Sequence, residues 1–171
     1  MFSIHNIQHT SLFAYIALTT PISTFTLSET SATANKWTKY AYIYLAAFST
    51  NVTLKFLLQT NKKITWGVDD VSILTSSSVE LLTNGGFEST PLTSGWTPGS
   101  LGLCSTTAGG TTNGCHTSTQ CYYDACDGAN ITISQSVAVT AGQSYNVSFW
   151  YYYDYQSGGG WSPVQMTVTL F

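Results

Sequence analysis

Residues 131–154 read ITISQSVAVTAGQSYNVSFWYYYD, and this stretch contains two runs of alternating residues on which the expected fold depends. Its first part alternates apolar and small polar residues, which is the two-residue period of a half-buried β-strand. Ala141-Gly142-Gln143 is a turn signal. A second alternation follows the turn, and it sends Tyr145, Val147, Phe149, Tyr151 and Tyr153 to one face and Asn146, Ser148, Trp150, Tyr152 and Asp154 to the other. The stretch therefore predicts two strands joined by a tight turn.

Similar patterns occur on both sides of this stretch. They predict strands at 22–27, 37–48, 52–58 and 164–170, and no helix signal has comparable strength. Many short strands separated by Gly-rich and Ser-rich turns are typical of a β-sandwich or jelly roll. The expected fold class is therefore all-β.

The composition excludes several classes of protein. Charged residues make up 8% of the 171 residues, Arg is absent, and the net charge is −3. Nucleic-acid binding through a basic patch is not expected from such a chain. A hydrophobic content of 43% argues against disorder, and no apolar run reaches the ~18 residues of a membrane span. The 27 Thr and 21 Ser instead indicate neutral, hydroxyl-rich strand surfaces.

The apolar stretch from Leu12 to Leu18 has two interpretations. It has the length of the apolar core of a signal peptide, but neither Lys nor Arg precedes it and no small-residue cleavage motif follows. The alternative is a buried strand.

The four cysteines, Cys104, Cys115, Cys121 and Cys126, lie close together in the sequence. Their spacing lacks the paired C-x₂-C pattern of a zinc site, so two disulfides are the favoured interpretation. Pairing of sequence neighbours would give Cys104–Cys115 and Cys121–Cys126, although three connectivities exist. Disulfides, together with glycosylation sequons at Asn51, Asn130 and Asn146, indicate a secreted or extracellular protein.

Three groups of motifs stand out along the chain. The first is the segment from Ile64 to Ile73, with Asp69-Asp70-Val71-Ser72. The second is the segment from Leu81 to Glu88, with Asn84-Gly85-Gly86-Phe87-Glu88, followed by Ser94-Gly95-Trp96. The third is Gln135-Ser136-Val137, the turn to Tyr145 and Ser148-Phe149-Trp150. Together these motifs resemble the carbohydrate-binding modules of the family 4/9 type, which have a galactose-binding-like jelly-roll fold. In this resemblance the first group corresponds to the closing strand of a module, the second to its opening strand and the third to its middle strands.

These motifs stand in reversed order. Residues 1–75 resemble the C-terminal half of a module and residues 81–171 the N-terminal half, with 75–80 as the joining loop. A single circularly permuted domain spanning 1–171 is the first interpretation, because either half alone would expose strand edges and an apolar face. Slices of two tandem domains, or a swapped assembly of several chains, are the alternatives.

The resemblance also implies a structural calcium ion. Its ligands would be Asp69, Asp70 and Glu88, with backbone carbonyls near Gly85 and Gly86, and these hard oxygen donors suit Ca²⁺. The alternative is that the two aspartates cap a strand end and that Glu88 is a solvated surface residue.

Sugar recognition needs exposed aromatic rings together with neutral hydrogen-bonding groups. The residues that we expect to supply such rings are Tyr44, Trp150, Tyr152 and Trp161, and the alternative for each is a place in the core. Trp37, Trp66 and Trp96 are expected in the core or at strand ends. A glycan on Asn146 would crowd Trp150 because both lie on the same face.

No arrangement of the eight carboxylates or of His5, His9 and His116 indicates catalysis. We therefore expect a non-catalytic extracellular domain that recognises a glycan or polysaccharide through aromatic platforms. The alternative is a structural or adhesive repeat that mediates protein–protein contact, homo-assembly or association with tandem neighbours.

Overall fold

The structure is a computed structural model, and it describes residues 23–28, 30–60, 64–101, 114–117, 119–124, 130–155 and 164–171. In this part of the chain nine strands form two antiparallel sheets, and no helix is present. The predictions for the stretch from Leu12 to Leu18 and for Cys104, Cys126 and Trp161 fall outside the described residues.

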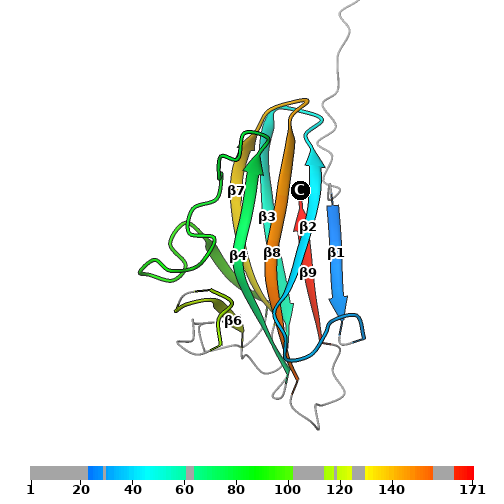
Figure 1. Cartoon of the computed structure of the whole chain (residues 1–171), viewed down its shortest axis with the longest axis vertical. Helices are drawn as coiled ribbons and strands as arrows, with labels where there is room; N and C mark the ends of the chain where they lie inside the picture. Colours follow the sequence, from blue (N-terminus) through cyan, green and yellow to red (C-terminus); the bar gives the residue numbers. More distant parts are fainter. Residues whose placement is uncertain are drawn as a thin grey trace, which may run out of the picture.

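Both sheets run along the long axis of the molecule (Figure 1). Sheet A has the order β1 (Ser23–Ser28), β9 (Gln165–Leu170), β3 (Thr50–Gln59), β7 (Asn130–Val139) and β5 (Thr97–Leu101). Sheet B has the order β2 (Thr38–Leu45), β8 (Ser144–Tyr155), β4 (Ile64–Thr75) and β6 (Tyr122–Asp124).

The two sheets face each other across one hydrophobic core, as the alternation predicts. The odd-numbered side chains of β8 from Tyr145 to Tyr153 are buried. On β7 the buried apolar side chains are also odd-numbered, namely Ile131, Ile133, Val137 and Val139. Phe56 of β3 meets Phe149 of β8 edge-on, with ring centroids 5.1 Å apart, so side chains of the two sheets interdigitate. The all-β, two-sheet architecture of a β-sandwich is therefore confirmed, whereas the jelly-roll subtype stays a prediction.

Strands from the two halves of the sequence are interleaved in both sheets, and only β7 and β5 are neighbours from the same half. In sheet A, β3 pairs with β7 on one side and with β9 on the other. In sheet B, β8 lies between β2 and β4. Each half thus completes the sheets of the other, which is the arrangement that the single-domain interpretation requires. The permuted order itself stays a prediction, because it depends on the resemblance.

The segment that follows β4 lies beside that strand within the same chain. Leu81 N donates to Ile73 O at 3.0 Å, and Val71 N donates to Gly85 O at 2.9 Å. The expectation of an opening strand at residues 81–88 was wrong, since the backbone there turns, with positive φ at Asn84 (55°) and Phe87 (56°). These turns bring the ring of Phe87 into the core, where its exposure is 0%.

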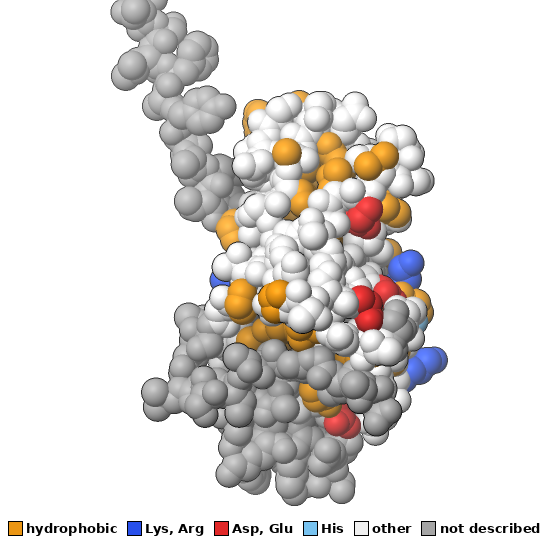
Figure 2. Space-filling view, turned by 90° about the vertical axis from the view of Figure 1, so that its left-hand side faces the viewer, with side chains coloured by type: hydrophobic (Ala, Val, Ile, Leu, Met, Phe, Trp, Pro, Cys, Tyr) orange, Lys and Arg blue, Asp and Glu red, His pale blue; other side chains and the backbone are white. Residues whose placement is uncertain are grey.

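Two short strands lacked a sequence signal. β5 contains Pro98 and Gly99, and β6 has only three residues, so neither shows a usable alternation. Outside the grey residues, the surface seen in Figure 2 is mostly white, which means backbone and uncharged polar side chains, with few charged groups. No helix in the described residues is long and apolar enough to cross a membrane.

Candidate aromatic binding face and its supporting loop

Aromatic side chains gather on the outer face of sheet B. Trp150 and Tyr152 point outward from β8, because the neighbouring odd-numbered side chains occupy the core, and both are half-buried. Tyr123 points outward from β6, and Trp37 lies one residue before β2. We call Trp37, Tyr123, Trp150 and Tyr152 the aromatic face.

Gly67 of β4 lies beneath three of these side chains, at the point where they come closest to one another. It pairs with Tyr152 of β8 on one side and with Tyr123 of β6 on the other. A Cβ at this position would lie 3.2 Å from the Trp37 ring, 3.2 Å from the Tyr123 ring and 3.3 Å from Tyr152 Cβ. Because Gly67 has no side chain, the Trp37 ring packs directly against the sheet. Its centroid is 5.4 Å from that of the Tyr152 ring.

Polar groups lie among the rings. Tyr123 donates its hydroxyl hydrogen to Asp154 Oδ2 at 2.9 Å and is also hydrogen-bonded to Thr65 Oγ1. Burial raises the pKa of Tyr123 to about 12, so its hydroxyl stays neutral over the physiological range. Lys39 of β2 lies opposite Trp150 in the register. The face thus combines flat rings with fixed hydrogen-bonding groups.

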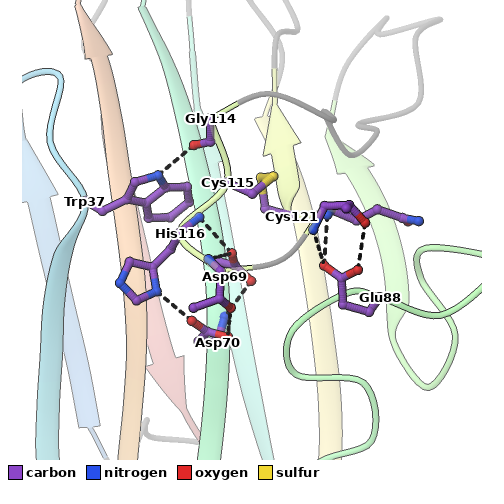
Figure 3. The surroundings of a disulfide bond; sticks show 11 residues. Trp37, Asp69, Asp70, Glu88, Gly114, Cys115, His116 and Cys121 are labelled. Atoms are coloured by element: carbon purple, nitrogen blue, oxygen red, sulfur yellow. Dashed lines mark hydrogen bonds and ion pairs between the residues drawn. A yellow bond between two sulfur atoms is a disulfide. The ribbon is translucent and has the colours of Figure 1, made fainter.

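A loop that includes residues 114–117 and 119–121 contacts two residues of the aromatic face, Trp37 and Trp150, and Figure 3 shows its position beside Trp37. Trp37 Nε1 donates to Gly114 O at 2.7 Å. The imidazole of His116 stacks on Trp150, with ring centroids 3.6 Å apart and planes 18° apart. These contacts fix the orientation of two of the four rings.

The loop is anchored on two neighbouring carboxylates of β4. Asp69 has no exposed surface, and its Oδ2 accepts from His116 N at 3.0 Å and Thr117 N at 3.2 Å, while its Oδ1 accepts from Asp70 N at 2.8 Å. Burial raises the pKa of Asp69 to about 6, and the three N–H donors offset part of that effect.

Asp70 binds side chains of the same loop. Its Oδ2 accepts from His116 Nδ1 at 2.6 Å, and its Oδ1 accepts from Thr117 Oγ1 at 2.7 Å. Asp70 has a positive φ of 45°, next to the register shift in β4, and this turns its side chain toward the loop alongside that of Asp69.

Glu88 holds the far end of the loop. Its Oε1 accepts from Thr119 N at 3.1 Å and Gln120 N at 2.8 Å, and its Oε2 accepts from Thr119 Oγ1 at 3.0 Å. The bond from Gln120 N is the largest cause that lowers the pKa of Glu88. Figure 3 shows Glu88 on the side of the disulfide away from His116.

The residues expected to bind calcium do not fit a calcium site in this arrangement. All six carboxylate oxygens of Asp69, Asp70 and Glu88 accept hydrogen bonds. The Gly85 carbonyl accepts from Val71 N, and Gly86 lies against Asp70, where a Cβ would be 3.6 Å from Oδ1. Within the described residues, no three His, Cys, Asp or Glu side chains gather closely enough to hold a metal ion.

The disulfide within the loop differs from the neighbour pairing. Cys115 is bonded to Cys121, with Cα atoms 5.5 Å apart, so the suggested pairs Cys104–Cys115 and Cys121–Cys126 were wrong. Six residues of separation close a small ring around the loop that carries His116 and Thr117.

The remaining predicted positions are spread over the molecule. Tyr44 is 7% exposed and packs against Tyr145 in the core, so it offers no ring face to a sugar. Asn51 and Asn146 are exposed, and Asn130 is half-buried. Asn146 pairs with Ile43 and Leu74, four residues along β8 from Trp150 or roughly 13 Å, so a glycan there would lie toward the other end of the sheet.

Sequence reasoning missed three members of this arrangement. Trp37 lies at a strand end, as expected, but its outward direction was missed; it shares the parity of Lys39, Ala41 and Ile43, which could have placed it on the outer face. Tyr123 is the outward residue of a very short strand. His116 is brought to Trp150 only by the tertiary fold.

Comparison with protein-family models, curated proteins and solved structures gave no match, so the resemblance to carbohydrate-binding modules depends on the motifs alone.

Proposed function

We propose that this chain is a non-catalytic, extracellular carbohydrate-binding domain with a galactose-binding-like jelly-roll fold, and that it binds a glycan or polysaccharide on the aromatic face. The observation that carries the proposal is the convergence of Trp37, Tyr123 and Tyr152 over Gly67 on a solvent-facing sheet. Side chains on the outside of a sheet do not need to be aromatic for folding, whereas a sugar needs ring faces for its C–H surface.

The polar surroundings support the same ligand class. Tyr123, Asp154 and Thr65 form a hydrogen-bonded set beside the rings, and neutral hydroxyls and carboxylates are the partners of sugar hydroxyls. The low charge of the whole chain, with 8% charged residues, is also compatible with an uncharged ligand.

The extracellular part of the proposal is supported by two features. The Cys115–Cys121 disulfide is stable in an oxidising compartment. The sequon residues Asn51 and Asn146 are exposed, as an acceptor for N-glycosylation must be.

Binding of the full chain to an array of β-glucans, xylans, mannans, chitin and animal-type glycans tests the proposal. Tyr152→Ala and Trp37→Ala should each lower the affinity for any bound glycan about 5- to 12-fold, since a lost stacking ring is worth about 1–1.5 kcal/mol. Phe48→Ala is the matched control, because Phe48 is 73% exposed in the turn after β2. No glycan bound, or equal loss in all three variants, would refute the proposal.

A structural or adhesive function is the second candidate, and exposed apolar residues favour it. Ile43 and Leu45 on the outer side of the edge strand β2 are 68% and 63% exposed, and Phe48 follows them. We call these three residues the apolar edge. Exposed apolar side chains on an edge strand are typical of a contact surface.

Analytical sedimentation of the full chain, which measures self-association, distinguishes the structural or adhesive function from glycan binding. Self-association that Leu45→Lys abolishes, without loss of glycan binding, would assign the apolar edge to assembly and leave the aromatic face to sugar. A monomer at high concentration that binds no other protein would remove the second candidate.

A further inference from the structure

The three carboxylates expected to surround calcium surround a segment of the chain instead. Residues 116–120 donate seven hydrogen bonds to Asp69, Asp70 and Glu88, four of them from backbone N–H groups. We propose that the loop closed by Cys115–Cys121 takes the place of a metal ion in this domain, so that the disulfide and not calcium holds the three carboxylates and the strands that carry them.

The direction of the hydrogen bonds supports this proposal. Every partner of these carboxylates is a donor, so the positive ends of N–H and O–H dipoles occupy the positions around the oxygens where a cation would lie. A carboxylate that accepts two or three such bonds is satisfied without a metal.

The placement of the anchors supports it further. Asp69 and Asp70 belong to β4, whereas Glu88 follows the turns after that strand, so the loop joins two segments that a shared metal would otherwise join. Gly85 and Gly86 lie between these anchors, and the Gly85 carbonyl is already bonded to Val71 N. The Gly85 carbonyl thus already serves to join the two segments.

The disulfide explains how a polar loop can serve as a rigid replacement. Cys115 and Cys121 lie at the two ends of the donor segment, six residues apart. Linking them restricts the segment to few conformations, so less entropy is lost when its N–H groups are fixed toward the carboxylates. The same loop places His116 against Trp150. We call the disulfide-closed loop and its bonds to the three carboxylates the clamp, and it therefore also fixes part of the aromatic face.

Thermal unfolding and amide exchange of the full chain test the proposal. The protein is measured after treatment with EGTA and again in millimolar CaCl₂. The melting temperature should be the same in both conditions. The exchange rates of the His116, Thr117, Thr119 and Gln120 amides should agree within about twofold. Calorimetric titration of CaCl₂ into the EGTA-treated protein should give no binding heat. A calcium-dependent rise in melting temperature, or slower exchange with calcium, would overturn the proposal.

Two variants test the part played by the loop. Cys115→Ser/Cys121→Ser should lower the melting temperature by about 5–10 °C and speed exchange of all four amides. Glu88→Ala, at an exposed site that does not endanger folding, should speed exchange of Thr119 and Gln120 but not of His116 and Thr117. Phe48→Ala, at a 73% exposed turn position away from the loop, is the control. Unchanged exchange in both loop variants would refute the clamp.

Discussion

The imidazole of His116 covers one face of the Trp150 indole, with ring centroids 3.6 Å apart and planes 18° apart. Two hydrogen bonds hold the imidazole in this position. His116 Nδ1 is bonded to Asp70 Oδ2 at 2.6 Å, and His116 N is bonded to Asp69 Oδ2 at 3.0 Å. A protein side chain therefore occupies a surface on which a sugar would otherwise stack, so Trp150 offers less free area than its half-buried position alone indicates.

Removal of this ring should uncover the indole. We expect His116→Ala to increase acrylamide quenching of the tryptophan fluorescence, since Trp150 gains solvent on the face that His116 covered. Trp150→Phe provides the background: introducing His116→Ala there should leave the quenching of the other tryptophans nearly unchanged. An equal increase in both backgrounds would mean that the substitution loosens the loop around Trp37 instead of uncovering Trp150.

Gly85 and Gly86 should respond very differently to alanine. A Cβ on Gly85 would lie 1.8 Å from the Val71 carbonyl oxygen, a backbone atom that cannot move without breaking the Val71–Gly85 hydrogen bond. On Gly86 the nearest atom would be 3.6 Å away. Denaturant unfolding should show a loss of about 3 kcal/mol or more for Gly85→Ala and under about 1 kcal/mol for Gly86→Ala. Similar losses for both would contradict the close approach of the two segments.

Gln135 should be worth more to stability than an ordinary strand glutamine. Its side chain is 9% exposed and forms two bonds with the Thr83 backbone, from Thr83 N to Oε1 at 2.7 Å and from Nε2 to Thr83 O at 2.9 Å. Gln135→Leu leaves both backbone groups without their partner, so we expect a loss of about 2–4 kcal/mol in denaturant unfolding. Gln143→Leu, at an exposed turn position, should change stability by less than ~0.5 kcal/mol, and equal effects would refute the role of Gln135.

The contrast between β8 and the loop shows what local sequence can predict. Burial of every second residue from Tyr145 to Tyr153 follows directly from the two-residue period, so the strand, its inner face and the outward direction of Trp150 and Tyr152 were all accessible. The bond between His116 N and Asp69 spans 47 residues, and no periodicity encodes a contact at that separation. For the same reason the acidic residues could be selected from motifs, but their partners could not.

Cysteine spacing illustrates the same limit. Four cysteines allow three connectivities, and spacing alone does not rank them reliably. The structure pairs Cys115 with Cys121 because both ends of the segment that binds Asp69 and Glu88 meet beside β4, which is a consequence of the fold and not of sequence proximity.

Thiol titration of cysteine variants checks this pairing directly. If Cys115 is bonded to Cys121, the double variant Cys115→Ser/Cys121→Ser should expose no new thiol under denaturing conditions, and each single variant should expose one. Under the neighbour pairing, the double variant would instead free two thiols, from Cys104 and Cys126. Two reactive thiols per chain in the double variant would therefore contradict the Cys115–Cys121 bond.

The buried carboxyl of Asp69 gives the stability a specific pH dependence. Its pKa in the folded chain is raised to about 6 from an ordinary 3.8, so between these values the folded state holds a proton that the unfolded state has lost. The contribution of Asp69 therefore favours folding below about pH 4, declines as the pH rises to 6, and amounts to a difference of about 3 kcal/mol. The carbon-13 shift of the Asp69 carboxyl should titrate with a midpoint near 6.

Glu88 acts in the opposite direction, because the N–H of Gln120 lowers its pKa in the folded state. Its contribution is present above the ordinary pKa of a glutamate and is lost as the pH falls through the lowered value. The free energy of unfolding of Glu88→Gln, measured between pH 3 and 7, should therefore rise more steeply toward low pH than that of the unmodified chain. Of these two opposing effects, only that of Asp69 remains in the variant. An Asp69 midpoint below about 4 would show that its three N–H donors outweigh the cost of burial.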